Sequence, residues 1–117
     1  MLGLGTEHTY YYYITPVDMR KGFNGLSGLV YEHLEQEQGK NIVYAFINKQ
    51  KNKLKLLHWR PGGFVLYYKR LEKGVFELPK YNIEVGLIVL TYTEMIMVLD
   101  GIRIVNISKN ERYLSNK

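Results

Sequence analysis

The stretch NKQKNKLKLLHWRPGGFVLYYKRLE, residues 48–72, decides how the fold is interpreted. A lysine-rich turn at residues 49–53 joins the apolar run of residues 42–48 to a second run, residues 54–59. A break at Arg60-Pro61-Gly62-Gly63 then turns the chain into residues 64–71. Apolar runs bounded by turn residues are typical of strands in hairpins, and Pro-Gly-Gly is a strong breaker. The stretch therefore predicts two or three adjacent strands whose ends and turn carry cations.

The cations of this stretch are the best functional clue in the sequence. Lysines recur every second residue from Lys49 to Lys55, so extended backbone would point them all to one side. Trp59, Tyr67 and Tyr68 lie close by in sequence, and cations beside aromatic rings suit a nucleic acid. The candidate phosphate contacts are Lys49, Lys51, Lys53, Lys55, Arg60, Lys69 and Arg70. The alternative is an ordinary solvated surface that keeps the protein in solution.

The rest of the chain predicts an α+β domain. Residues 10–15 indicate a first strand, in which four tyrosines put two rings on each face. Asp18 is the expected N-cap of one longer helix that runs to about Gln36, with Gly39 as its stop. Its buried stripe is expected at Met19, Phe23, Leu26, Val30 and Leu34.

After the central stretch, residues 75–78 form a short extended piece and residues 83–90 a strand that Gly86 weakens or bulges. Thr91 and Glu94 form a capping-box signature for a short helix that ends before Gly101. Residues 102–107 are expected as a last strand. The predicted fold is a mainly antiparallel sheet with the N-terminal helix packed on one face and the short helix near the end.

Two features of the N-terminal helix need a reason. Gly22, Gly25 and Gly28 lie three apart on one flank, where each costs about 1 kcal/mol against alanine. Their spacing suggests close approach of another backbone, either the sheet or a partner. Arg20 and Lys21 lie in the first turn, where the helix dipole disfavours cations, so a bound anion would relieve the conflict. Solvation, or pairing with acids such as Glu7, is the alternative.

Composition predicts a single, cytoplasmic domain. Its 117 residues suit one domain, 1–117, with an ordered core from about residue 8 to 107 and a frayed tail at 108–117. The chain has no cysteine, no basic and apolar leader at its start, and no apolar run long enough for a bilayer.

The net charge of +5 is uneven, because residues 38–82 carry ten basic and two acidic residues. Such a localised positive field steers one surface toward polyanions.

Catalytic and metal-binding patterns are missing from the sequence. His8, His33 and His58 are scattered, with His33 expected on the flank or core of the helix and His58 on the hairpin surface. Asp18 and Asp100 are better explained as helix-end residues, and no acid pair is set to hold Mg²⁺. We therefore expect no enzyme activity, no cofactor and no metal.

Several long strings are similar to one known family. Residues 16–30, PVDMRKGFNGLSGLV, resemble the signature helix of the TnpB-type (Orf2-like) accessory proteins of the insertion sequence 66 family. A second block matches in order and spacing: residues 45–49 and 54–59, Gly63-Phe64, and residues 69–79. The resemblance runs from about Tyr11 to Gly101. It implies a small factor that assists a separate transposase and has no defined activity of its own.

The family pattern usually has arginines where this chain has Lys49, Gln50 and Lys51, and an acid in place of Asn52. Lysine binds phosphate as a point charge without the arginine fork, which favours backbone contact over base reading.

Two hypotheses follow from the sequence. In the first, the protein is a non-catalytic accessory factor of transposition that binds DNA through its basic hairpin, with Arg20 and Lys21 as a second anion point. In the second, it is a protein-interaction module that binds the transposase or another element-encoded protein through the glycine flank and the tyrosine strand, and touches DNA weakly or not at all. Assembly into a homo-oligomer is left open by the sequence. An unrecognised nuclease, with Asp18, Glu72 and Asp100 as metal ligands, is a distant third.

Overall fold

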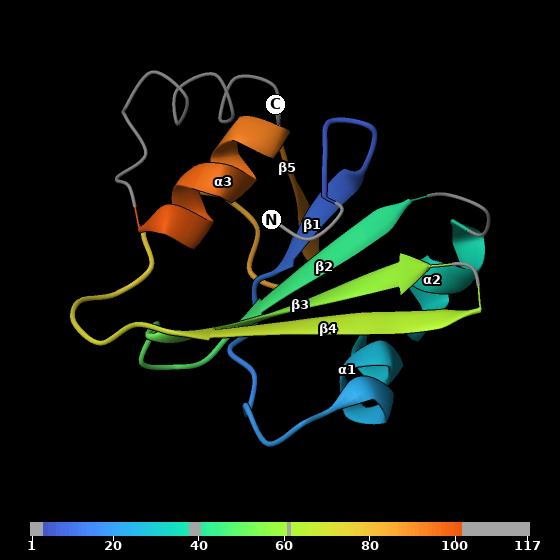
Figure 1. The fold of residues 1–117 in the computed structure, drawn as a ribbon, viewed down its shortest axis with the longest axis horizontal. Helices are drawn as coiled ribbons and strands as arrows, with labels where there is room; N and C mark the ends of the chain where they lie inside the picture. Colours follow the sequence, from blue (N-terminus) through green and yellow to red (C-terminus); the bar gives the residue numbers. More distant parts are fainter. Residues whose placement is uncertain (1–3, 38–40, 61, 102–117) are drawn as a thin grey trace.

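The protein, seen in a computed structural model, is described over residues 4–37, 41–60 and 62–101. These residues form five strands and three helices (Figure 1). In chain order they are β1 (Thr9–Tyr13), α1 (Phe23–Leu29), α2 (Tyr31–Gln36), β2 (Ile42–Ile47), β3 (Lys53–Arg60), β4 (Gly63–Arg70), β5 (Leu87–Leu90) and α3 (Tyr92–Asp100). The strands form one sheet of order β4-β3-β2-β1-β5. The expected last strand, residues 102–107, and the tail lie outside the described residues.

The sheet is mixed, which corrects the expected mainly antiparallel arrangement. Strands β1 and β5, β2 and β3, and β3 and β4 pair antiparallel, but β1 and β2 pair parallel. The parallel pair arises because α1 and α2 return the chain to the end of the sheet at which β1 begins. Parallel neighbouring strands need such a crossover connection.

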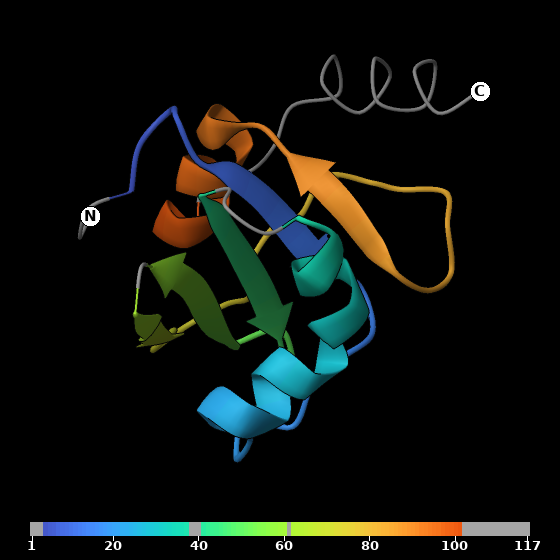
Figure 2. The same cartoon turned by 90° about the vertical axis from the view of Figure 1, so that its right-hand side faces the viewer.

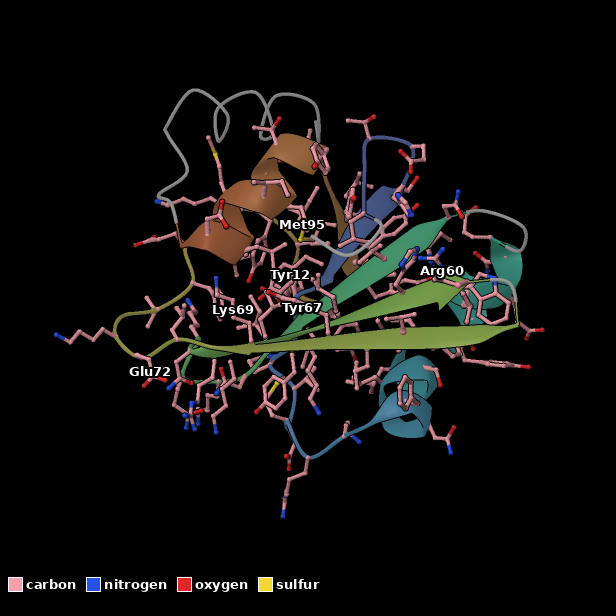
Figure 3. The ribbon with its side chains drawn as sticks, in the orientation of Figure 1. Tyr12, Arg60, Tyr67, Lys69, Glu72 and Met95 are labelled. Atoms are coloured by element: carbon pink, nitrogen blue, oxygen red, sulfur yellow. The ribbon has the colours of Figure 1, made fainter. Side chains whose placement is uncertain are left out.

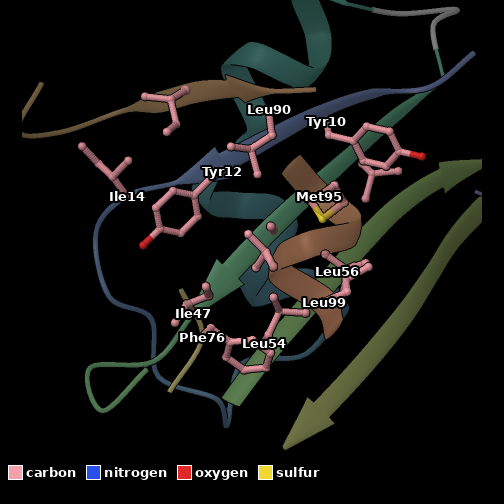
Figure 4. Close-up of a cluster of buried hydrophobic side chains, with 14 residues drawn as sticks. Tyr10, Tyr12, Ile14, Ile47, Leu54, Leu56, Phe76, Leu90, Met95 and Leu99 are labelled. Carbon is pink, nitrogen blue, oxygen red and sulfur yellow. The ribbon is translucent and has the colours of Figure 1, made fainter. Parts of the chain in front are cut away.

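Helices cover both faces of the sheet (Figures 1 and 2). Strand β2 is buried at every position, as expected for its unbroken apolar run. On the α3 side, side chains of β1, β2 and β3 pack against Met95, Val98 and Leu99 of α3 and against Phe76 (Figure 4). On the other side, Tyr44, Phe46 and Leu57 pack against Leu26 and Val30. Each such side chain contributes about 1.5–3 kcal/mol when fully buried.

The tyrosine strand divides its rings between the two faces, as predicted. Tyr10 and Tyr12 are buried on the α3 side, whereas Tyr11 and Tyr13 are half-buried on the α1 and α2 side. The Tyr10 hydroxyl donates a 2.7 Å hydrogen bond to the carbonyl of Gly5, and burial raises the pKa of Tyr10 to about 12.

The single longer helix predicted for residues 18–36 is wrong. The chain forms two short helices that meet at Val30, whose φ and ψ of −118° and 15° leave the helical region. Asp18 does not cap either one, because its carboxylate accepts hydrogen bonds from the backbone and side chain of Arg20. Gly22 is the N-cap of α1. Phe23, which was expected in the buried stripe, is 48% exposed.

The C-terminal helix agrees with its sequence signature. Thr91 accepts a hydrogen bond from the Glu94 amide, and the Glu94 carboxylate accepts one from the Thr91 amide. Gly101 ends α3 with a left-handed φ of 75°. Two neighbouring predictions are only partly met. Residues 75–78, expected as a short extended piece, lie outside the sheet with Phe76 buried, and the predicted strand of residues 83–90 begins only at Leu87, after Gly86 with φ of 108°.

His58 is buried, not on the hairpin surface as expected. It lies on the α3 side of β3, where its ring meets the ring of His8 at 4.7 Å between centroids. The Nδ1 atom of His8 accepts a hydrogen bond from the Gly5 amide and lies 3.3 Å from the Glu7 carboxylate. Burial, together with the nearby charges of His8 and Arg60, lowers the pKa of His58 below its ordinary 6.5.

This burial predicts acid sensitivity. Because the folded protein holds the His58 pKa below 6.5, the unfolded chain binds more protons between the two values, and stability falls as pH drops through that window. We expect the urea midpoint of the wild type to decrease between pH 7.5 and pH 5 and the decrease to be smaller in His58→Gln. An equal decrease in both proteins would contradict this account.

Candidate nucleic-acid interface

One cleft brings together cations from separate parts of the chain. It has a volume of about 590 Å³ and lies among the loop after β1, the β2–β3 turn and the neighbouring ends of β3 and β4. Its lining residues are Pro16, Val17, Asp18, Met19, Arg20, Asn48, Lys49, Gln50, Lys53 and Tyr68. We call this the basic cleft. Three of the predicted phosphate-contacting residues line it: Arg20, Lys49 and Lys53.

Asn48 fixes the turn that carries the lysines. Its side-chain carbonyl accepts hydrogen bonds from the amides of Asn52 and Lys53, both at 3.0 Å. Its side-chain amide donates to Asn52 at 2.8 Å and to Gln50 at 3.2 Å. Lys51 takes the left-handed φ of 61° that this tight turn requires. The predicted row of lysines on one side is therefore wrong for Lys49 and Lys51, which lie in the turn, and holds for Lys53 and Lys55 in β3.

Lys55 fastens the loop of residues 17–22 to the sheet. The residue is only 6% exposed, and its ammonium donates 2.7 Å hydrogen bonds to the carbonyls of Met19 and Lys21. The same ammonium lies 4.8 Å from the centre of the Tyr68 ring. The backbone of Val17 adds a 2.9 Å hydrogen bond to the carbonyl of Ile47 at the end of β2. Lys55 thus holds the cleft wall in place, a role that the alternating lysine pattern did not reveal.

Arg20 is preoriented by its neighbour. Its guanidinium meets the Asp18 carboxylate through two nitrogens, the closer at 2.6 Å, and the Arg20 amide donates to the same carboxylate at 2.8 Å. These hydrogen bonds lower the pKa of Asp18 to about 2, so the carboxylate is charged at neutral pH. Lys49 and Lys53, in contrast, make no ion pair with any residue that the structure describes. The sequence predicted pairing of Arg20 with an acid as one alternative.

The other predicted cations do not join the cleft lining. Lys69 and Arg60 lie on the α3 side of the sheet and toward opposite ends of it (Figure 3). Lys69 donates a hydrogen bond to the carbonyl of Leu99 at the end of α3. Arg70 faces the same side as Lys53, its cross-strand partner, and lies 3.6 Å from the exposed Glu72. Lys21 and Lys51 are exposed on the loops beside the cleft.

The cleft also has an apolar component that the sequence did not assign. Tyr68 is 51% exposed although it lies in a strand, and it lines the cleft together with Pro16, Val17 and Met19. The sequence places Tyr68 among the cations as an aromatic ring, but it gives no sign that Pro16 and Met19 line a cleft.

Acidic and histidine side chains do not gather in the described residues in any group of three or more that could hold a metal ion. His33 instead lies on α2, where its Nδ1 is 2.8 Å from the hydroxyl of the buried Tyr44.

Among the described helices, none is both long and apolar enough to cross a membrane.

The sequence of residues 8–109 matches the family described as IS66 Orf2-like protein. The chain belongs to the IS66 Orf2-like family. This confirms the resemblance noted in the sequence, and membership suggests an accessory role in transposition. An uncharacterized protein of Sinorhizobium fredii, y4jC, is 36% identical over 64 residues. That match covers 55% of this chain and 55% of y4jC, so the chain spans about half the length of this relative. No solved structure matches the chain.

Replacing Lys55 tests whether its hydrogen bonds to the loop of residues 17–22 stabilise the fold and the cleft of this IS66 Orf2-like protein. Lys55→Met keeps an unbranched apolar side chain but removes the ammonium that donates to two carbonyls, so we expect a loss of about 1.5–3 kcal/mol in the free energy of unfolding. Amide exchange should accelerate in residues 17–22. The matched control Lys49→Met changes an exposed lysine and should stay within about 0.5 kcal/mol. Equal stabilities of the two variants would contradict the assigned role.

Proposed function

We propose that the protein assists transposition by binding the phosphate backbone of DNA at the basic cleft. The observation that carries the proposal is the convergence on one cleft of Arg20, from the loop after β1, with Lys49 and Lys53, from the hairpin of β2 and β3. A phosphate backbone offers a line of anions, and cations that share a concave surface can meet several of them at once. Arg70, on the same side of the sheet as Lys53, extends the positive surface along β4.

The proposed set differs from the nine cations expected from sequence. Lys55 is excluded because its ammonium is buried and bound to carbonyls. Lys69 and Arg60 are excluded because they lie on the α3 side of the sheet (Figure 3). Lys21 and Lys51 remain as flanking contacts on the exposed loops. Because lysines dominate and supply single point charges, the proposal predicts weak sequence preference.

A salt titration tests this function. If Arg20, Lys49, Lys53 and Arg70 each neutralise one phosphate, the logarithm of the association constant should fall against the logarithm of salt concentration with a slope of about −3 to −4. Replacing Lys49 and Lys53 together by glutamine should weaken binding of a short labelled duplex or single strand about tenfold or more at low salt, and reduce the slope by about 2. Fluorescence anisotropy measures both quantities.

The matched control replaces Lys73 and Lys80 by glutamine. Both lysines are exposed and outside the cleft, and the change in net charge is the same. If the control weakened binding as much as the cleft variant, the field of the whole protein would explain binding and the cleft would not. Affinity that does not change with salt would remove the DNA proposal.

A second function, assembly with the transposase, is favoured by the outer surface of α1 and α2. A Cβ atom added at Gly22 or Gly28 would meet no described atom within 4 Å, so the sheet does not explain these glycines. Phe23, between them, is 48% exposed, and Tyr31 on α2 is 57% exposed. Small residues that flank exposed aromatic rings suit the close approach of a partner protein.

Co-purification distinguishes the two functions. We expect a complex with the transposase to survive high salt and nuclease treatment, and Phe23→Ser to weaken it while the double glutamine variant at Lys49 and Lys53 does not. A complex that nuclease dissolves would show that DNA bridges the proteins and would contradict direct assembly.

A further inference from the structure

The basic cleft has two kinds of wall, and phosphate binding explains only one of them. Arg20, Lys49 and Lys53 supply positive charge, whereas Pro16, Met19 and the ring of Tyr68 supply apolar surface. A site for phosphates alone needs donors and cations and gains nothing from apolar walls. A nucleotide has both parts, an anionic phosphate and an aromatic base.

Tyr68 is placed as a stacking platform. It lies in β4, an edge strand that pairs with β3 over eight residue pairs, so the backbone beneath the ring is fixed. Half of the residue remains exposed even though its ring lies over the ammonium of Lys55 at 4.8 Å. Lys55 is itself held by two carbonyl hydrogen bonds, so the ring rests on a fixed cation. An aromatic ring held in this way beside a positive groove is the usual device for binding unpaired bases.

Duplex DNA cannot use these apolar walls. Its bases are stacked and paired, so a protein reaches only phosphates, sugars and the base edges in the grooves. An unpaired strand can place a base face directly on an aromatic ring. The volume of about 590 Å³ lies within the range of sites that enclose small organic ligands.

We propose that the basic cleft takes an unpaired nucleotide of a DNA strand, with its base stacked on Tyr68 and the adjoining phosphates on Arg20, Lys49 and Lys53. This inference rests on the proposed DNA function and narrows its substrate to single-stranded or end-frayed DNA. The Asp18 carboxylate is the one anion that lines the described cleft. In the free protein this carboxylate accepts hydrogen bonds from the guanidinium of Arg20. A bound phosphate is a second acceptor for the same guanidinium.

The experiment compares three labelled DNA probes of one sequence with the full chain by fluorescence anisotropy. The probes are a single strand, the blunt duplex, and a single strand whose central nucleotides lack bases. We expect the single strand to bind about tenfold more tightly than either of the others, because stacking on an aromatic ring strengthens binding by that order. Base-free and normal strands carry the same phosphates, so their difference isolates the base.

Variants of Tyr68 locate the effect. Tyr68→Ala should reduce affinity for the normal single strand about tenfold and leave the base-free strand unchanged, whereas Tyr68→Phe should behave as the wild type. Tyr31→Ala, which removes an equally exposed tyrosine outside the cleft, is the control and should bind all probes normally. Thermal unfolding of each variant identifies any loss of folded protein. Tyr68→Phe and the base-free probe still decide the question if Tyr68→Ala is unstable.

The outcomes separate this inference from the function beneath it. Equal affinity for normal and base-free strands, or an equal loss in Tyr68→Ala for both, would overturn stacking while leaving phosphate binding intact. Tighter binding of the blunt duplex would also overturn it. Displacement of every DNA probe by an acidic peptide of matched charge would show a general polyanion surface and overturn the nucleotide site. If no probe bound at all, the DNA function itself would fail.

Discussion

A strand that is buried on both faces requires side chains that can leave water, and every side chain of β2 from Ile42 to Ile47 is aliphatic or aromatic. The requirement creates two cores, since alternate side chains of one strand point to opposite sides. Each core needs its own cover, and α3 supplies one while α1 and α2 supply the other. Because α1 and α2 lie between β1 and β2 in the chain, these two strands run parallel and the loop after β1 passes beside the end of β2. The basic cleft forms at that crossing.

Lys55 joins the sheet to this loop. A lysine that points into a covered face would be unfavourable without acceptors, and two backbone carbonyls of residues 19 and 21 provide them. The loop that Lys55 holds precedes α1, which begins only at Phe23. Lys55, the Val17 backbone and the Asp18 carboxylate together fix the path of the loop that carries Arg20.

Most of the strands could be predicted because their signals are local. Apolar runs, the Pro-Gly-Gly break and the capping box of Thr91 and Glu94 each act within a few residues, and the structure places elements where they predict them. The direction of β1 against β2 could not be predicted, because pairing depends on how the crossover packs. The broken helix was missed for a related reason: its apolar spacing is helical, but the loop before Phe23 is held by contacts with β2 and β3 that are distant in sequence.

The cations show the same limit. Alternation correctly placed Lys53 and Lys55 on one side of β3, yet it could not show that one would be a cleft residue and the other buried beneath it. Nor could it show that Lys69 would meet the end of α3. Lys49 and Lys51 left the pattern because the side chain of Asn48 organises a tight turn, in which Lys51 adopts a positive φ.

The choice of acceptors for Lys55 has a consequence for the conditions in which the cleft persists. Amide carbonyls have no proton to gain in ordinary acid, whereas the Asp18 carboxylate that holds Arg20 becomes neutral once the pH falls below about 2. The hydrogen bonds of Lys55 to the loop and the ion pair of Asp18 with Arg20 therefore respond differently to acidity. Protonation of Asp18 would release the Arg20 guanidinium, while the loop of residues 17–22 would stay bound to Lys55.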